Sequence, residues 1–303
     1  MIMSMEKDIL DKYRKAGRIG AEVLAEAGKM VVPGTKLIDI ANRVDKLIME
    51  KGAEAAFPVN ISLNENAAHY TPPFNDETTI KEEDIVKIDI GAHIDGYIGD
   101  TASTFSPQKN QLIDAVNKAL DAAIKTVRPG IRVSDIGAAV EDAAKDHGVG
   151  LIVNLTGHGL GRFEFHAQPS IPNTRNESSH VLKDGDAIAI EPFTCPTNGF
   201  VKEAGSGSEI FQYVMDRPVR LTEARRILQT ARDQYHGLPF AKRWLFEKFS
   251  PVKVSMAIHQ LESVGALQAY PVLREVEGKP IAQAEHTLIV ADKPIVTTMM
   301  SSE

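Results

Sequence analysis

Two windows of this chain, residues 33–52 and 129–148, align without a gap at a separation of 96 residues. Each window opens with Pro-Gly, continues with apolar residues at helical spacing and closes on a glycine. Pro-Gly pairs and helix-ending glycines also recur by chance, but an internal duplication explains the agreement better. The repeat therefore predicts two similar α+β halves around a pseudo-twofold axis. The identical pairs are Pro33/Pro129, Gly34/Gly130, Asp39/Asp135, Ile40/Ile136, Val44/Val140 and Gly52/Gly148.

Helices and strands are expected in the same order around each window. Apolar spacing predicts a long helix before each one, at 6–29 and 109–127, and a shorter helix inside it, at 36–50 and 133–146. Because Pro cannot continue a helix, each Pro-Gly pair should end the long helix before it.

Strands should follow the windows. Residues 84–90 alternate apolar and polar side chains, Asp95-Gly96 is a hairpin signal, and residues 97–104 return as the partner strand. In the second half, the apolar run 187–190 predicts a buried strand that ends at Glu191, and a last strand is expected near 284–290.

Residues 216–275 have a different pattern. Thr222 is expected to cap a helix at 223–235, and shorter helices should follow at 241–249 and 252–264. We interpret this stretch as a helical subdomain inserted into the second half. The catalytic domain would then comprise residues 1–215 and 276–303.

Composition limits the classes of protein. The net charge of −7 argues against a molecule built to bind polyanions, although residues 217–253 carry nine Lys and Arg against three Asp and Glu. One cysteine excludes an intramolecular disulfide and fits a reducing compartment. We find no signal peptide and no apolar run of about 18 residues that could span a membrane. We expect a soluble, cytoplasmic protein.

The predicted hairpin brings two acids together. With a two-residue turn, position 100 lies opposite position 91, so Asp89 and Asp100 become diagonal neighbours on one face, about 7 Å apart at the backbone. Two such carboxylates repel each other unless a cation lies between them, and Gly91 would leave room for it. A β-bulge would break this register, and the alternative is that both acids face water.

Two histidines lie in one apolar, glycine-rich segment. His158 stands between Gly157 and Gly159, which predicts a tight backbone bend that presents one imidazole, and His166 follows eight residues later. Either histidine alone is more often structural. Their occurrence together favours a functional site.

Two further acids occupy apolar strands. Glu191 ends the run Ala-Ile-Ala-Ile, and Glu285 lies in Ala-Glu-His-Thr-Leu-Ile-Val. A buried carboxylate is costly unless it is paired or binds a metal. The alternative is a buried salt bridge, but few basic residues lie nearby in the sequence.

Four carboxylates and one imidazole make a plausible metal-binding set. Four negative charges balance two divalent cations, and oxygen-rich ligation with one nitrogen suits Mn, Co, Fe or Zn. Two such cations can activate one water, so the predicted reaction is hydrolysis of an amide or an ester. The set is Asp89, Asp100, His158, Glu191 and Glu285.

The order and spacing of this set resemble those of the pita-bread metallopeptidases, in particular the type 2 methionine aminopeptidases of archaeal form. Residues 57–72, 87–96 and 283–286 carry further matching motifs, and the likeness covers nearly the whole chain. It implies a pseudo-twofold pita-bread fold with an inserted helical subdomain. It also implies removal of the initiator methionine from nascent proteins, with a small second residue preferred.

The resemblance further implies a role for each residue of the set. Asp89 would chelate one metal, His158 and Glu191 would bind the other, and Asp100 and Glu285 would bridge the two. A hydroxide bridging this dinuclear centre would be the nucleophile.

The same resemblance assigns residues to the substrate. His69 would contact it near the scissile nitrogen, and His166 would hydrogen-bond the carbonyl oxygen as that oxygen gains charge. Glu191 would carry the proton from the attacking water to the leaving amine. Phe57 would form one wall of the methionine pocket, and the weaker candidates for that pocket are Phe193, Ile210 and Tyr270.

Two other functions compete with this interpretation. A prolidase or Xaa-Pro aminopeptidase shares the fold and a similar ligand set, but usually has a separate N-terminal domain, for which a first helix near residue 6 leaves no room. A nucleic-acid or ribosome-binding module would use the basic insert. Its footprint would be Arg225, Arg226, Arg232, Lys242 and Arg243, which could equally form a solvated basic face.

The expected partners follow from the favoured interpretation. They are the N-termini of nascent polypeptides, with ribosome contact through the basic insert as a further option. No membrane partner is expected, and the resemblance implies a monomer. Cys195 is not expected to be a nucleophile, because no base is evident beside it.

Overall fold

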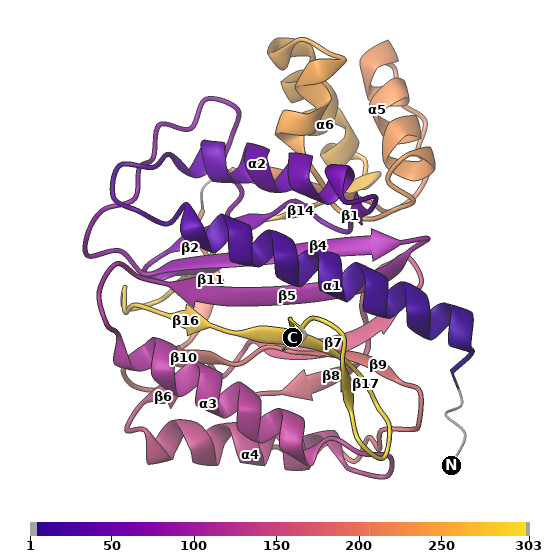
Figure 1. Ribbon diagram of the computed structural model, residues 1–303. Helices are drawn as coiled ribbons and strands as arrows, with labels where there is room; N and C mark the ends of the chain where they lie inside the picture. Colours follow the sequence, from indigo (N-terminus) through magenta and orange to yellow (C-terminus); the bar gives the residue numbers. More distant parts are fainter. Residues whose placement is uncertain (1–4, 206, 301–303) are drawn as a thin grey trace.

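The computed structural model describes residues 5–205 and 207–300, and its layers are visible in Figure 1. A central sheet is covered by α1 and α2 in one half and by α3 and α4 in the other, while α5 and α6 stand together at the top of the view. The helices are α1 (Lys7–Lys29), α2 (Leu37–Glu50), α3 (Gln111–Thr126), α4 (Val133–Asp146), α5 (Thr222–Asp233), the 3₁₀ helix η1 (Lys242–Glu247) and α6 (Pro251–Ser263).

The main sheet is antiparallel throughout and joins the two halves of the chain. Its strand order is β1-β4-β5-β17-β9-β7-β8, with β2 also paired to β4 and β18 to β17. The late strand β17 lies between β5 of the first half and β9 of the second. The strands of this sheet are β1 (Glu54–Ala55), β2 (Asn60–Leu63), β4 (Val86–Ile94), β5 (Tyr97–Phe105), β7 (Thr156–Gly161), β8 (Glu164–Pro172), β9 (Ala187–Ile190), β17 (Glu285–Ile289) and β18 (Ile295–Val296).

Three small antiparallel sheets surround the main one, in the orders β16-β10-β6, β11-β15-β3 and β13-β12-β14. Their strands are β3 (Asn66–Ala68), β6 (Gly150–Leu151), β10 (Phe193–Cys195), β11 (Val201–Glu203), β12 (Ile210–Tyr213), β13 (Phe240–Ala241), β14 (Leu267–Tyr270), β15 (Leu273–Glu275) and β16 (Ala282–Gln283). No helix within 5–205 and 207–300 is long and apolar enough to cross a membrane.

The predicted repeat is present in the structure. The four predicted helices of the two windows appear as α1 to α4. The aligned glycines of the two windows also have similar, positive φ angles. Gly34 and Gly130 both have positive φ and each donates its N–H to a carbonyl 2.8 Å away, that of Ile80 and that of Leu182. Because the same bond recurs with the same geometry in both halves, the sequence agreement reflects a shared structure rather than chance.

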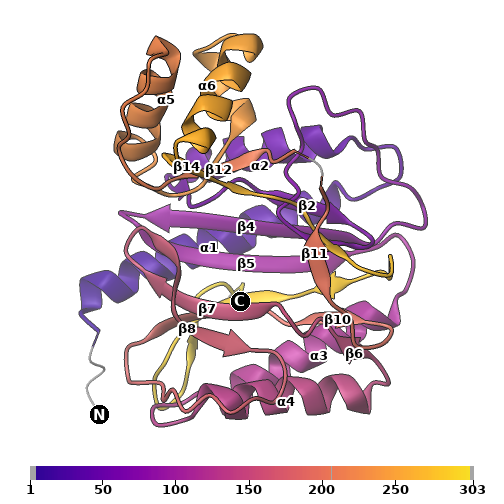
Figure 2. The same cartoon turned by 180° about the vertical axis from the view of Figure 1, so that it is seen from behind.

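Close approach of α1 to the sheet depends on glycine. A Cβ on Gly99 of β5 would lie 2.4 Å from the Cα of Gly17, and a Cβ on Gly17 would meet the carbonyl of Thr297 at 2.4 Å. The two glycines therefore let the helix backbone rest almost directly on β5, with α1 lying across β4 and β5 (Figures 1 and 2). This contact fixes the back of the strands that carry Asp89 and Asp100.

The predicted hairpin is confirmed, but its glycine has another use. Asp95 and Gly96 form the turn with φ of +52° and +87°, and Gly91 lies opposite Asp100 as expected. The space over Gly91 is taken by an aromatic ring, since a Cβ there would lie 2.3 Å from Cε1 of Phe57. The expectation that Gly91 leaves room for a cation is therefore wrong. The glycine admits the Phe57 ring instead.

The inserted region contains the predicted helices together with a small sheet. Thr222 is the first residue of α5 rather than its cap, because the N-cap is Leu221 and makes no side-chain capping bond. The helix expected at 241–249 is the shorter 3₁₀ helix η1. The sheet β13-β12-β14 pairs Ile210–Tyr213, which precede residue 216, with strands of the insert. The division into a catalytic domain and a helical insert stays a prediction.

Candidate metal centre

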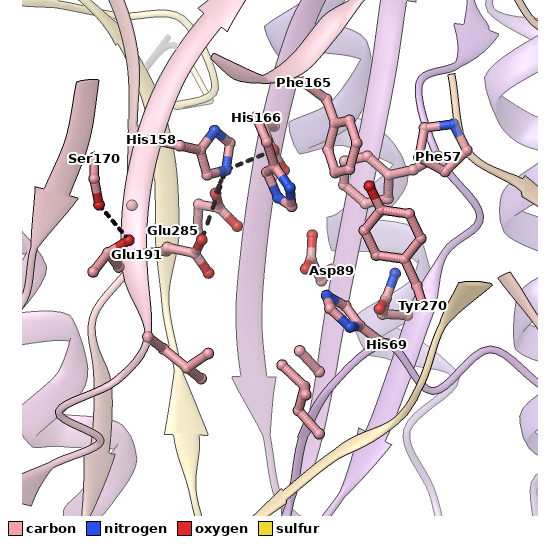
Figure 3. A pocket seen from close by; sticks show the side chains of 18 of the residues that line it. Phe57, His69, Asp89, His158, Phe165, His166, Ser170, Glu191, Tyr270 and Glu285 are labelled. Carbon is pink, nitrogen blue, oxygen red and sulfur yellow. Dashed lines mark hydrogen bonds and ion pairs between the residues drawn. The ribbon is translucent and has the colours of Figure 1, made fainter. Parts of the chain in front are cut away.

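A pocket of about 340 Å³ lies against the main sheet. Figure 3 shows His158, Glu191 and Glu285 on one side of it and Phe57, His69 and Tyr270 on the other. The structure thus gathers every candidate site residue around this one pocket, although they come from distant parts of the chain. These residues are Phe57, His69, Asp89, Asp100, His158, His166, Glu191, Phe193, Ile210, Tyr270 and Glu285.

The four acids come from neighbouring strands. Asp89 on β4 and Glu285 on β17 are both opposite Ala102 of β5, and Glu191 directly follows β9. Asp100 is two residues from Ala102 on β5, so the acids converge where these strands run side by side. The ring of His158 completes the group: its Nε2 lies 3.7 Å from Asp100 Oδ2, 3.7 Å from Glu191 Oε1 and 4.0 Å from Glu285 Oε1.

Burial makes this cluster costly without a cation. It raises the pKa of Asp89 to about 7, and burial followed by the neighbouring carboxylates raises the pKa of Asp100, Glu191 and Glu285 well above the usual range. Asp89 Oδ1, Asp100 Oδ1 and Glu285 Oε1 are buried and have no hydrogen-bond partner. Such oxygens need either protons or metal ions to be stable there.

The buried lysine nearest to Asp89 in the sequence makes its hydrogen bonds elsewhere. Lys87 lies two residues before Asp89 and is only 1% exposed, but its Nζ donates at 3.0 Å to the carbonyls of Asn64 and Ile281. Burial lowers the pKa of Lys87 to about 7. Lys87 therefore links two backbone segments by hydrogen bonds and is not the counter-ion of the four acids.

His158 is oriented to offer a lone pair to a cation. Its Nδ1 lies 3.1 Å from the carbonyl of Gly159, which can only accept, so Nδ1 carries the proton and Nε2 is free. Burial lowers the pKa of His158 to about 4, which keeps the ring neutral near pH 7. A metal-binding histidine typically donates its other ring N–H to such a carbonyl.

The prediction of a tight backbone bend around His158 is wrong. Thr156–Gly161 instead forms the strand β7, whose pairing with β8 has an irregular register. The flanking glycines serve close packing: a Cβ on Gly157 would lie 2.3 Å from the carbonyl of Ala189, and one on Gly159 would lie 2.2 Å from that of Gln168. The strand can therefore sit tightly between its neighbours and direct His158 into the pocket.

Threonine hydroxyls hold the backbone at two of the acids. Thr287 Oγ1 accepts the N–H of Asp100 at 2.8 Å and donates to the carbonyl of Asp100 at 2.9 Å. Thr101 donates to the carbonyl of Glu285 at 3.0 Å. Asp100 and Glu285 are thereby tied across the β5–β17 contact, and both side chains face His158.

The donor set fits divalent metal ions. Ligand atoms of Asp100, His158 and Glu285 lie within 4.8 Å of one another, and all three residues are buried. Asp89 and Glu191 add a carboxylate on either side, and Gln283 Nε2 lies 3.4 Å from an oxygen of each. Carboxylate oxygens with one imidazole nitrogen are ligands that suit Mn, Fe, Co and Zn.

His69 has an unusual backbone and a defined tautomer. Its φ of +64° is left-handed, which costs free energy for a residue with a Cβ. Its Nδ1 lies 3.1 Å from the carbonyl of Pro271, so Nδ1 carries the proton and Nε2 is an acceptor. The ring meets that of Tyr270 edge to face at 5.4 Å. His69 is thus held to accept a hydrogen bond inside the pocket.

His166 lies between the acids and the aromatic wall. Its ring centroid is 4.6 Å from that of His158 and 3.8 Å from that of Phe165. Desolvation, followed by the neighbouring His158 and His69, lowers the pKa of His166, so the ring is neutral near pH 7. A neutral imidazole with one N–H can donate a hydrogen bond to an oxygen that gains charge.

The apolar part of the pocket contains more than the sequence suggested. Phe57, Phe193 and Ile210 are buried, and Phe165 meets Phe57 at 5.8 Å. Sequence reasoning missed Phe165 and Gln283. Phe165 is adjacent to His166 in a strand of alternating exposure, and Gln283 is a polar residue in an apolar run, so both had a local signal.

Comparison with known sequences gives a consistent result. Residues 11–222 match metallopeptidase family M24. A methionine aminopeptidase of Thermococcus onnurineus is 49% identical over 279 residues, which cover 91% of this chain and 94% of the relative. A methionine aminopeptidase of Archaeoglobus fulgidus is 47% identical over 290 residues, which cover 95% and 97%.

Solved structures show the same fold at low sequence identity. A thermophilic Arx1 superposes with a TM-score of 0.86 at 21% identity, over 99% of this chain and 93% of the other. A methionine aminopeptidase of Thermotoga maritima gives 0.69 at 24% identity, over 99% and 100%. The pita-bread fold that the sequence implied is confirmed.

Proposed function

This chain belongs to metallopeptidase family M24, and on that basis we propose that it removes the N-terminal methionine from nascent proteins and peptides. The observation that carries the proposal is the buried group of Asp100, His158 and Glu285, with ligand atoms within 4.8 Å of one another in a pocket that also has an aromatic wall. Relatives named methionine aminopeptidase cover more than nine-tenths of the chain.

Two divalent cations of Mn, Co, Fe or Zn are proposed for the centre. Asp89 would chelate one, His158 and Glu191 would hold the other, and Asp100 and Glu285 would bridge them. When bound, such a pair lowers the pKa of a shared water and polarises the substrate carbonyl. Glu191 would carry the proton from that water to the leaving amine, because its carboxylate lines the same pocket, with Oε1 3.7 Å from Nε2 of His158.

The two free histidines are proposed to hold the substrate. Nε2 of His69, unprotonated in the tautomer set by Pro271, would accept a hydrogen bond near the scissile nitrogen. The neutral ring of His166 would donate to the carbonyl oxygen as negative charge develops there. Both rings face the same pocket as the acids (Figure 3).

The apolar wall would take the methionine side chain. Phe57 and Phe165 form an aromatic side, and Phe193, Ile210 and Tyr270 also line the pocket. A flexible thioether fills such an irregular apolar space well. We propose in addition that the second residue of the substrate must be small.

Ribosome contact through the basic insert has less support. Arg232 pairs with Asp216 and Asp233, Lys253 pairs with Glu223, and Arg243 pairs with Asp45. Lys242 also pairs with Glu209, so four of the nine Lys and Arg residues of 217–253 contact an acid, which reduces the electrostatic footprint for RNA. The monomeric state and the cytoplasmic location stay predictions.

Peptide cleavage followed by mass spectrometry tests the proposed function. The chelator-stripped protein is supplied with Mn or Co and given Met-Ala-Ser, Met-Leu-Ser and Ala-Pro-Ser. We expect metal-dependent release of methionine from the first peptide and little from the second, because its second residue is large. Cleavage of Ala-Pro-Ser alone would indicate a prolidase-type enzyme such as an Xaa-Pro aminopeptidase, and no cleavage with any metal would refute peptidase activity on these substrates.

A further inference from the structure

We propose that Gln283 is a positioning residue of the metal centre, whose side-chain amide holds Asp89 and Glu191 at the separation that two metal ions require. The inference rests on the ligand roles proposed above, in which Asp89 belongs to one metal and Glu191 to the other. It adds a residue that is not itself a ligand but decides whether both sites form.

The amide of Gln283 lies between the two acids. Its Nε2 is 3.4 Å from Asp89 Oδ2 and 3.4 Å from Glu191 Oε2, and the residue is only 1% exposed. An amide nitrogen has two hydrogens, which matches two acceptors. Because both partners are acceptors when ionised, the nitrogen rather than the oxygen of the amide must face them.

The backbone around Gln283 is fixed by side chains of the hairpin. Thr104 Oγ1 accepts the N–H of Gln283 at 2.7 Å and donates to its carbonyl at 2.6 Å. Lys87, which lies opposite Thr104 in the β4–β5 register, donates to the carbonyl of Ile281 at 3.0 Å. Thr101 does the same for Glu285 at 3.0 Å.

On its other side, Gln283 pairs with Phe193 of β10, two residues beyond Glu191. The segment 281–285 is therefore hydrogen-bonded on both sides. On the hairpin side the bonds are made at alternate residues, 281, 283 and 285. The amide has little freedom to leave the two carboxylates. Burying the polar groups of Lys87 and Thr104 costs free energy. Apolar side chains would fill the same space without that cost, so the two residues indicate that the position of this segment matters.

The contacts also select which oxygens remain for metal ions. Gln283 engages Oδ2 of Asp89 and Oε2 of Glu191, while Asp89 Oδ1 has no partner and Glu191 Oε1 lies 3.7 Å from Nε2 of His158. Without the amide, two like charges in a buried space would turn apart. Partners of this kind orient metal ligands, and their loss typically costs about 10- to 100-fold in affinity.

Metal titration of the chelator-stripped, full-length protein tests this role. Gln283→Met keeps the length of the side chain but removes both donors. Calorimetry with MnCl₂ should show about 10- to 100-fold weaker binding at one of two sites. At two equivalents of Mn, electron paramagnetic resonance should show isolated ions where the wild type shows an exchange-coupled pair. Gln268→Met, at an exposed position of β14, is the matched control and should titrate like the wild type.

The outcomes separate this inference from the proposed function. Two Mn sites of wild-type affinity and a coupled spectrum in Gln283→Met would overturn the role of Gln283, whereas the wild-type protein would still cleave Met-Ala-Ser. Failure of the wild type to bind two ions would refute the dinuclear premise and the inference with it. If circular dichroism shows that Gln283→Met is unfolded, Thr104→Val, which frees the Gln283 backbone, should weaken the same site, and unchanged binding there would overturn the proposal.

Discussion

Asp100 is the residue at which burial, charge and position coincide. It is 2% exposed, its Oδ1 has no hydrogen-bond partner, and its Oδ2 lies 3.7 Å from His158. Asp100→Asn keeps the shape but removes a charge proposed to bridge two cations. We expect at least about a thousandfold loss of turnover, since a metal supplies several kcal/mol of transition-state stabilisation. Metal analysis should find fewer than two ions per chain.

The same substitution should not harm the metal-free fold. Burial already penalises the Asp100 charge, so the chelator-stripped variant should melt no lower than the stripped wild type. Asp114→Asn, at an exposed position in the first turn of α3, is a control that should change neither activity nor metal content. Full activity in Asp100→Asn would show that the bridging role is assigned to the wrong residue.

His69 allows the substrate role to be separated from metal binding. His69→Ala should retain two metal ions but lose about a hundredfold in turnover, because the acceptor at Nε2 is removed. Calorimetry with MnCl₂ and peptide kinetics measure the two properties independently. His259→Ala, exposed on α6, should leave both unchanged. Loss of a metal site in His69→Ala would mean that His69 is a ligand.

At this scale, part of the site was readable from sequence. The register that places Asp100 opposite Gly91 follows from one turn signal, Asp95-Gly96. The use of Gly91 did not follow, because Phe57 reaches it from a segment far away in the sequence. The partner that fixes the tautomer of His69 is a backbone carbonyl, at Pro271, and a carbonyl leaves no mark on the sequence.

At the scale of elements, η1 anchors the inserted region beside the pocket. Arg243 is 4% exposed in its side chain, pairs with Asp45 of α2 at 2.8 Å and donates to Thr71 and to the carbonyl of Pro72. Thr71 and Pro72 lie two and three residues after His69 in the sequence. Arg243→Met should therefore lower turnover at least about tenfold through loss of positioning, while Mn binding stays the same. Peptide kinetics and calorimetry on one preparation measure both.

A loss confined to stability would contradict this coupling. Arg243→Met breaks a buried ion pair, for which about 3–5 kcal/mol is typical, so its melting temperature should fall. Lys253→Met, which removes the exposed pair with Glu223 inside the insert, is the matched control and should alter neither turnover nor melting noticeably. Normal turnover of folded Arg243→Met would show that the insert does not position His69.

Element prediction succeeded where the signal is local and failed where packing decides. Helices α1 to α4 follow from apolar spacing and terminal glycines. The strand β7 did not, because Gly157 and Gly159 suggested a bend, whereas they permit close contact with Ala189 and Gln168. The sheet β13-β12-β14 was also missed, since its strands are short and lie far apart in sequence.

At the scale of the whole molecule, the metal centre should couple stability to pH. A carboxyl whose folded pKa is raised contributes stability below its unfolded pKa, and that stability is lost as pH rises through the folded pKa. For Asp89 this window runs from about 4 to about 7, and Asp100, Glu191 and Glu285, whose pKa values are also raised, act in the same direction. His158 has the opposite effect, because its pKa is lowered. Its contribution to stability is lost as pH falls below about 6.5.

The difference in melting temperature between metal-loaded and metal-free protein reports the protonation of the buried carboxylates. Metal ions bind the ionised acids, so binding must displace protons at pH 6 but fewer at pH 8. We therefore expect Mn to raise the melting temperature more at pH 8 than at pH 6. Calorimetric scans of stripped and Mn-loaded protein at both pH values measure this, and Asp100→Asn should reduce the gain at each. A larger gain at pH 6 would mean that Mn stabilises the fold through groups other than these buried acids.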